Sequence, residues 1–151
     1  MASVALTGKD TIIIDSRILN DLADADTGVL EFPNNLSEVK AGKNGNALYA
    51  FNAQGVLVNF TLRVIRGSSD DKYLMSRLQQ YINDPAGFIF MEAELIKRAG
   101  DGAGNITTDT YKVAGGVPQK MPAAKENVAG DTEQAVSIYA ITFGNTQRTL
   151  G

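Results

Sequence analysis

The chain has 151 residues, a formal net charge of −3, and neither cysteine nor histidine. Without those two residue types it cannot supply a thiolate nucleophile, an imidazole base, a disulfide or a Cys/His zinc site, and we expect no cofactor. A mildly acidic chain also lacks the clustered lysines and arginines that bind phosphate backbones without regard to sequence. The length is typical of one domain, so residues 1–151 are expected to fold as a single unit.

Two kinds of targeting segment are not recognisable in the sequence. No apolar run approaches the roughly 18–20 residues that span a bilayer, so no membrane insertion is expected. The first ten residues have neither the positive start nor the long apolar stretch of a signal peptide. The sequence therefore favours a product of the cytoplasm.

Short β-branched or apolar segments dominate the first third of the chain. Residues 11–14 and 29–32 are each predicted to form a strand. Residues 36–51 contain two further extended segments on either side of Asn44-Gly45. An Asn-Gly pair in this setting predicts a β-hairpin, because a type I′ turn needs positive φ at both central residues.

A longer strand is predicted for residues 56–66, directly after a break at Gly55. Its side chains alternate with period 2 between two faces of the strand. One face is entirely apolar and consists of Val56, Val58, Phe60, Leu62 and Val64. The other face is mixed and consists of Leu57, Asn59, Thr61, Arg63 and Ile65. We expect the apolar face to pack against the core of the domain.

The hydrophobic period changes after Gly67, where the sequence predicts its one helix. Residues 68–71 offer two serines as N-cap candidates and two carboxylates for the first turn. An apolar stripe at helical spacing follows, made of Leu74, Leu78, Tyr81 and Ile82. Pro85 ends the helix, because the residue before a proline avoids the α region.

Strand signals return in the second half of the chain. Residues 88–97, 106–113 and 136–143 are predicted strands, and residues 117–121 a short edge strand. Residues 123–133 are polar and are expected to be exposed. With so little helix the sheet cannot be a parallel, doubly wound one. The predicted fold class is mainly β: an antiparallel β-sandwich or barrel with one α-helix packed on it.

Two patterns resemble ligand sites and fail on their spacing. The glycine-rich residues 100–105 are followed by strand-like residues, whereas a phosphate loop leads into a helix N-terminus. The acidic residues 21–31 do not have the spacing of a calcium-binding EF-hand. Neither a cofactor site nor a metal site is predicted.

Glu92 and Glu94 are the most enzyme-like pair in the chain. On one strand face they would lie about 7 Å apart, a separation compatible in principle with paired glycosidase carboxylates. Such carboxylates usually come from different strands on either side of the sugar, and the chain has no tryptophan against which a sugar could stack. We therefore expect a polar strand face and not an enzyme.

Residues 39–78 carry a resemblance to a known family. In chain order they contain a Gly-x-x-Gly turn, a short apolar strand, a long strand opened by glycine, and a serine-capped helix. The residues concerned are Gly42, Gly45, Gly55, the strand residues 56–62, Ser68, Ser69, Leu74 and Leu78. This order resembles the tail tube proteins of contractile phages, which are related to the tube subunits of type VI secretion systems and pyocin-like particles.

The resemblance implies a structural subunit of a bacteriophage tail tube, made in the host cytoplasm and localised in the virion tail. Copies would assemble into stacked rings, expected to be hexameric, that enclose a conduit through which DNA passes without specific binding. A tail sheath and baseplate proteins are the other implied partners. Long edge strands suit this plan, because pairing with neighbouring copies removes the exposed edges.

The resemblance also implies roles for particular residues. The candidates for lining the lumen are Asn59, Thr61, Arg63, Glu92 and Glu94, the two carboxylates because they would repel DNA phosphates. The candidates for contacts between stacked rings are Lys43, Asn44, Gly45 and Asn46. Two alternatives stay open: a type VI-like secreted tube protein, and a monomeric carbohydrate-binding β-sandwich with an aromatic and polar groove.

Overall fold

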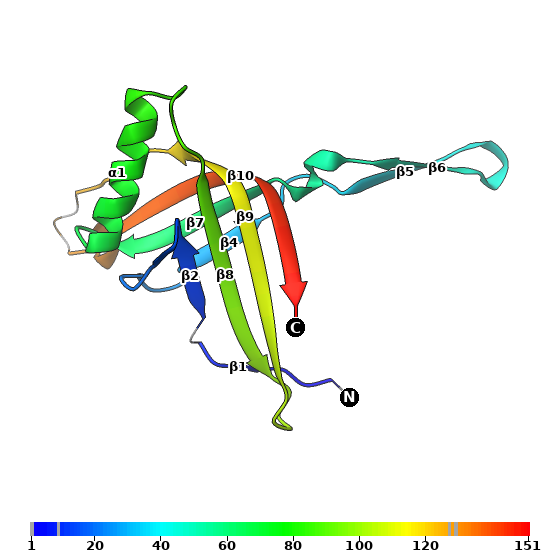
Figure 1. Cartoon of the computed structure of the whole chain (residues 1–151), viewed down its shortest axis with the longest axis horizontal. Coiled ribbons are helices and arrows are strands. Elements are labelled where there is room, and N and C mark those ends of the chain that lie inside the picture. Colours follow the sequence, from blue (N-terminus) through cyan, green and yellow to red (C-terminus); the bar gives the residue numbers. More distant parts are fainter. Residues whose placement is uncertain (1, 9, 127, 129) are drawn as a thin grey trace.

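A computed structural model describes residues 2–8, 10–126, 128 and 130–151. These residues form one antiparallel sheet of eight strands, a separate two-stranded hairpin and one α-helix (Figure 1). The strands are β1 (Ala5–Leu6), β2 (Thr11–Ile14), β3 (Arg17–Ile18), β4 (Gly28–Glu31), β5 (Ser37–Ala41), β6 (Ala47–Phe51), β7 (Val58–Ile65), β8 (Met91–Gly100), β9 (Ile106–Lys120) and β10 (Val136–Leu150). The helix is α1 (Ser69–Asn83), and short 3₁₀ turns cover Lys43–Gly45, Ala53–Val56 and Thr132–Ala135.

The large sheet bends into two layers that share the strand β10. The order of its strands is β3-β2-β8-β9-β10-β7-β4, and β1 also pairs with β8. The first part of β10, residues 136–143, pairs with β7, whereas residues 140–150 pair with β9. Figure 1 shows β10 curving from the direction of β7 into the direction of β8 and β9. The sheet does not close into a barrel. We call β4, β7 and the start of β10 the first layer, and β2, β8, β9 and the end of β10 the second layer.

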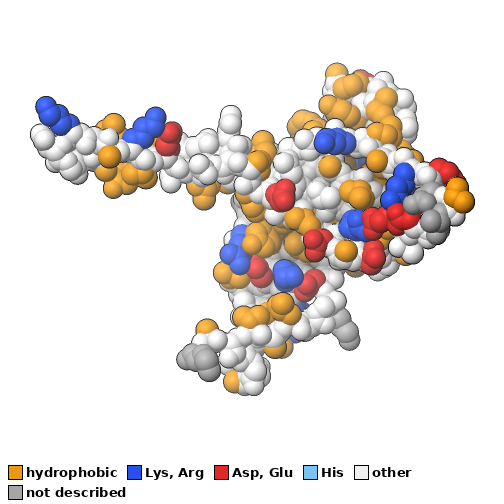
Figure 2. All heavy atoms as spheres, turned by 180° about the vertical axis from the view of Figure 1, so that it is seen from behind, with side chains coloured by type: hydrophobic (Ala, Val, Ile, Leu, Met, Phe, Trp, Pro, Cys, Tyr) orange, Lys and Arg blue, Asp and Glu red, His pale blue; other side chains and the backbone are white. Residues whose placement is uncertain are grey.

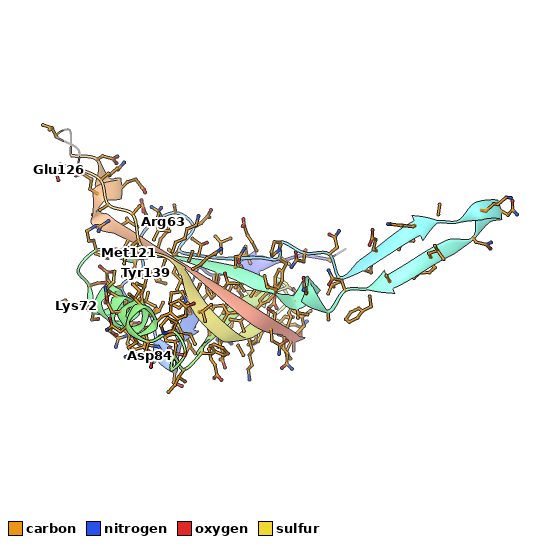
Figure 3. All side chains as sticks on the ribbon, turned by 90° about the horizontal axis from the view of Figure 1, so that it is seen from above. Arg63, Lys72, Asp84, Met121, Glu126 and Tyr139 are labelled. Carbon is orange, nitrogen blue, oxygen red and sulfur yellow. The ribbon has the colours of Figure 1, made fainter. Side chains whose placement is uncertain are left out.

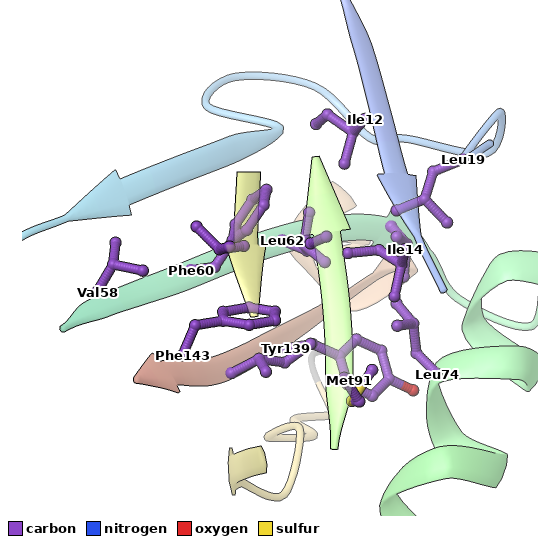
Figure 4. Close-up of a cluster of buried hydrophobic side chains, with 14 of the residues drawn as sticks. Ile12, Ile14, Leu19, Val58, Phe60, Leu62, Leu74, Met91, Tyr139 and Phe143 are labelled. Atoms are coloured by element: carbon purple, nitrogen blue, oxygen red, sulfur yellow. The ribbon is translucent and has the colours of Figure 1, made fainter. Parts of the chain in front are cut away.

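The core fills the space between the two layers and is capped by α1 (Figure 4). The burial pattern of β7 shows which of its faces lies on this core. Its residues are buried at every second position from Val58 to Val64 and half-buried between them. This pattern is the period-2 alternation of a strand with one face on a core. The buried apolar cluster consists of Ile12, Ile14, Leu19, Val58, Phe60, Leu62, Val64, Leu74, Leu78, Met91, Ala93, Val113, Tyr139, Ile141 and Phe143.

Helix α1 begins and ends as the sequence predicts. The side chain of Ser68 accepts a hydrogen bond from the backbone N–H of Asp71, which makes Ser68 the N-cap. Leu74 and Leu78 are buried, and the helix ends at Asn83. The predicted apolar stripe is wrong at its last member, because Ile82 is 51% exposed. The helix packs on the core as far as Leu78 and leaves the apolar side chain of Ile82 exposed to solvent near its end.

A buried carboxylate fastens the start of α1 to the segment after β3. Asp70 is 1% exposed. Its Oδ2 accepts hydrogen bonds from the backbone N–H groups of Asn20 and Asp21, both at 2.8 Å. Its Oδ1 accepts from Nε of Arg17 at 3.1 Å. One carboxylate thus satisfies three donors that would otherwise lack a partner in a half-buried position.

The prediction of a mainly β, antiparallel fold with one packed helix is confirmed. The strand lengths differ from those expected. The strand β7 starts at Val58, later than predicted, because Ala53–Val56 form a 3₁₀ turn capped by Asn52. Both β9 and β10 are longer than predicted. The segment 117–121 is not a separate edge strand, since β9 continues to Lys120.

The polar segment 123–133 contains two residues, Asn127 and Ala129, that lie outside the described part of the chain. Most of the described residues of this segment are exposed, as expected from their composition.

Replacing Asp70 by alanine should lower the free energy of unfolding by about 3 kcal/mol, because two half-buried N–H groups and one guanidinium lose the buried carboxylate that accepts their hydrogen bonds. Urea denaturation followed by circular dichroism measures this. The matched control is Lys72→Ala, an exposed position on the same helix, which should change the stability by less than about 0.5 kcal/mol. An equal effect of the two substitutions would contradict the fastening role of Asp70.

Candidate assembly surfaces

The hairpin of β5 and β6 projects far from the rest of the molecule (Figures 1 and 3). The two strands pair with each other from Ser37↔Phe51 to Ala41↔Ala47 and with no other described strand. Every residue of both strands is exposed. An isolated two-stranded hairpin is only marginally stable in water, so this arm gains stability when a further surface covers it.

The hairpin turn has the geometry that its sequence predicts. Asn44 (φ 59°, ψ 39°) and Gly45 (φ 79°) both lie in the left-handed region, as a type I′ turn requires. The side-chain amide of Asn46 donates a hydrogen bond to the backbone carbonyl of Lys43 at 2.9 Å. The structure therefore brings the four ring-stacking candidates, Lys43 to Asn46, together at the tip of the projecting arm.

One face of the arm is apolar. In the register of the hairpin Val39 lies opposite Tyr49, and Phe51 follows two positions further on the same face. These side chains are 57%, 79% and 79% exposed. The space-filling view shows the apolar side chains along the projecting arm (Figure 2). Contiguous exposed apolar side chains of this kind are typical of protein–protein contacts.

The first group of lumen candidates lies on the first layer. Asn59, Thr61 and Arg63 alternate with the buried residues of β7 and point away from the core. Asn59 accepts a hydrogen bond from Thr142 of β10 at 3.0 Å. Thr61 lies between Val29 of β4 and β10 in the strand register. The outer face of this layer is thus a mixture of hydroxyl, amide and small apolar groups.

Arg63 is already neutralised by neighbouring carboxylates. Its guanidinium forms ion pairs with Glu133 at 2.7 Å and with Asp24 at 3.2 Å. Only 14% of its side chain is exposed. Figure 3 shows Arg63 on the opposite side of the sheet from the helix, whereas Tyr139 points toward the helix. The cation therefore fastens two loops to β7 and offers little free charge to a ligand.

The second group of candidates lies on the second layer. Glu92 is exposed at the start of β8, and Glu94 lies between Ile13 of β2 and Lys112 of β9 in the strand register. A carboxylate oxygen of Glu94 is 4.0 Å from Nζ of Lys112. A shallow hollow of about 570 Å³ on this face is lined by both glutamates, Asp15 and Lys112 among others.

The structure does not bring the two groups of lumen candidates together. The inner side chains of β7, such as Phe60 and Leu62, and those of β8, such as Met91 and Ala93, belong to one core cluster. The outer faces of the two layers therefore point in opposite directions. Asn59, Thr61 and Arg63 therefore lie on one outer face of the subunit, and Glu92 and Glu94 lie on the other.

In the described part of the chain no cluster of three or more acidic, histidine or cysteine side chains is arranged to hold a metal ion. No helix among the described residues is long and apolar enough to cross a membrane.

The sequence patterns did not predict that the second half of β10 is a strand. Residues 144–150 are mostly small and polar, so they carry no apolar alternation that would mark a strand. In the structure they pair with β9, and Arg148 lies over the ring of Tyr111 and forms an ion pair with Asp109 at 2.8 Å. The guanidinium holds the pKa of the Asp109 carboxyl below its usual range. The sequence did carry one signal for a strand here: threonine recurs in both β9 and β10, and β-branched residues favour strands.

Replacing residues 37–51 by a short Gly-Ser linker should leave the thermal midpoint of the monomer within about 2 °C, because the hairpin buries almost no surface against the body. Differential scanning fluorimetry measures this. A matched control is Gly116→Ala, where an added Cβ would come within 2.4 Å of the ring of Phe143 and should lower the midpoint clearly. A large drop for the hairpin deletion would show that the arm is part of the folding unit.

Comparison with known proteins identifies the fold. No protein-family model matches the sequence, and no curated protein matches it. A chain of the sheath–tube complex of an extracellular contractile injection system, PVC, in its extended state matches with a TM-score of 0.54 at 12% identity, over 94% of this chain and 87% of that chain. A chain of the sheath/tube terminator of PVC matches with the same TM-score and identity, over 94% of this chain and 92% of that chain. The resemblance to contractile-tail tube proteins is thereby confirmed at the level of the fold.

Proposed function

We propose that this protein is the structural subunit of a bacteriophage tail tube that assembles with copies of itself into stacked rings around a hollow conduit for DNA. The observation that carries the proposal is the projecting hairpin on a fold shared with chains of a sheath–tube complex. A fully exposed arm with an apolar face gives each copy a means to reach its neighbour. The rings would be hexameric, and the tube would lie inside a sheath, attached to a baseplate.

The projecting arm is suited to stacking rings along the axis of the proposed tube. A contact between the hairpin of one copy and a different surface of the next is heterologous, and such contacts build closed rings or extended filaments. The tip residues Lys43 to Asn46 lie farthest from the body and would contact the adjacent ring. The subunit would be made in the host cytoplasm and function in the virion tail.

The lumen wall belongs to one layer only. We assign it to the second layer, where Glu92 and Glu94 are accessible and would keep phosphates from adhering. In this arrangement Asn59, Thr61 and Arg63 face away from the channel. The opposite arrangement places these three residues in the lumen and both glutamates outside it.

Thiol labelling distinguishes the two arrangements, because the chain has no cysteine of its own. Assembled tubes of Glu94→Cys should react slowly with a thiol reagent too large to enter the tube and quickly with a small one. Tubes of Thr61→Cys should react quickly with both. The reverse result would place the first layer in the lumen. Unassembled subunits of each variant provide the reference rate.

Assembly itself is tested by negative-stain microscopy and light scattering of the purified protein over a range of concentration and salt. Ring-shaped particles or tubes with a central hole are the expected result. A protein that remains monomeric at every concentration and salt, while well folded by circular dichroism, would contradict the tube proposal.

A second candidate is the tube of an injection particle that carries no genome. It is favoured by the PVC chains, whose system is described as an extracellular contractile injection system. The discriminating measurement is nuclease-resistant DNA in particles purified from cells that make them. Protected DNA of uniform length supports the phage tail, and particles without it support the injection system.

A further inference from the structure

The second half of β10 has an open edge. β7 accompanies β10 only as far as the pair Phe143↔Val58, after which the chain of β7 leaves through the turn Ala53–Val56 to the hairpin. Residues 144–150 of β10 continue with β9 on one side. No described strand pairs with them on the other side. The turn Ala53–Val56 lies beside the start of this edge, where Oγ1 of Thr146 donates a hydrogen bond to the carbonyl of Val56 at 2.8 Å, so the edge is open beyond Thr146. An open edge of this length is a template for a further strand.

The hydrogen-bonding pattern identifies the free backbone groups. Gly151 and Thr108 exchange both backbone hydrogen bonds, at 2.8 and 3.0 Å. The register between β9 and β10 is uninterrupted from Asn145 to Leu150. Since backbone groups in an antiparallel strand point alternately to either side, the N–H and C=O groups of Thr146, Arg148 and Leu150 point to the open edge.

The side chains along this edge have two different faces. Thr146 and Arg148 lie opposite Val113 and Tyr111, so they share the face of the core, and Leu150 follows on it. This face ends in exposed apolar groups: Leu150 is 58% exposed, and Phe32, which packs against the ring of Tyr111, is 42% exposed. The opposite face carries the polar side chains of Asn145, Gln147 and Thr149.

Strand β5 of the hairpin has the same two-faced pattern in a strand of similar length. Each strand of the hairpin has five residues and a free outer edge. On β5, Val39 lies on one face and the ion pair between Glu38 and Lys40 on the other. On β6, Tyr49 and Phe51 lie on the first face, and Leu48 and Ala50 lie beside the ion pair on the second, so β6 is apolar on both faces. Added to β10 with its apolar face on the core side, the hairpin would cover Leu150 and Phe32 and keep its charged face among polar groups. A shift by one residue would reverse both faces, so the pattern also fixes the register.

We propose that the β5–β6 hairpin of a second copy adds to the open edge of residues 144–150 of β10 and continues the second layer of the sheet. This inference rests on the proposed self-assembly and names its contact. The hairpin of the same copy cannot occupy the edge, because β6 is joined to β7 through the 3₁₀ turn Ala53–Val56 and the arm points away from β10 (Figure 1). The main-chain hydrogen bonds would supply affinity, and the apolar face would supply orientation.

Cysteine cross-linking tests the contact directly. Gln147→Cys on the polar face of β10 is combined, in turn, with Glu38→Cys or Lys40→Cys on β5 and with Leu48→Cys or Ala50→Cys on β6. Directly opposed residues on paired strands lie within the Cα separation that a disulfide bridges. Mild oxidation of the assembled protein should give cross-linked dimers for at least one strand. Combining Lys72→Cys on the outer face of α1 with Glu38→Cys is the matched control and should give none.

A proline pair tests the hydrogen bonds. Leu150→Pro removes an N–H that points to the open edge, so the monomer should keep its thermal midpoint while the concentration needed for assembly rises about tenfold. Thr149→Pro removes an N–H that points to β9 and should lower the midpoint instead. Leu150→Ala keeps the N–H and should assemble at a concentration closer to that of the wild type.

The outcomes separate this inference from the proposed function. If the wild type forms no rings or tubes, the proposed function fails together with the contact. If the wild type assembles, Leu150→Pro assembles equally well, and no hairpin position cross-links to Gln147→Cys, the hairpin–β10 contact is wrong while the tube remains. Cross-links with one hairpin strand and not the other support the contact and identify the strand that pairs.

Discussion

The fold depends on β10 pairing with two different neighbours along its length. Its first half hydrogen-bonds to β7 and its second half to β9, so one continuous strand holds the two layers around the core. The bend requires a close approach at Gly116, where the ring of Phe143 occupies the space that a Cβ would need. Phe143 is fully buried and lies against Phe60 of β7, with ring centroids 6.3 Å apart. A side chain at position 116 would therefore disturb both the ladder and the centre of the core.

The same arrangement leaves one edge of the sheet without a paired strand among the described residues. β7 is shorter than β10, because the chain leaves the sheet at Val58 to form the hairpin. Because the chain leaves the sheet here, an edge of β10 stays open. The same departure produces the β5–β6 arm, whose outer strand edges and apolar face have no partner among the other described strands. Helix α1, by contrast, has its buried contacts satisfied by Asp70, Leu74 and Leu78 within the subunit. The open edge and the projecting arm both lie away from the helix (Figure 1).

Local sequence signals predicted the elements that depend on short-range chemistry. The Asn44-Gly45 turn, the Ser68 cap and the alternation of β7 each follow from a few neighbouring residues, and each appears in the structure. The end of β10 was not predictable in this way, because its stability comes from cross-strand contacts such as Arg148 with Tyr111 and Asp109. The period-2 alternation within a strand also could not show which side chains of different strands lie on the same surface of the molecule. Thr61 and Glu94 both point outward from their strands, and only the bend of the sheet shows that they lie on opposite sides of the core.

Several of the charged side chains on the two layers are paired with a charge of opposite sign. Arg63 is neutralised by Glu133 and Asp24 in the first layer, and Lys112 lies near Glu94 in the second. A surface with isolated lysines or arginines would hold a polyanion, because each neutralised phosphate releases counterions and adds affinity. The first layer, with paired charges among threonine and asparagine side chains, lacks that source of affinity, whereas the second layer also carries the exposed Arg98 on the same face as Glu94. The tube that we propose would need weak interaction with what passes through it and strong interaction between copies, and the apolar face of the hairpin and the open edge of β10 are available for the second.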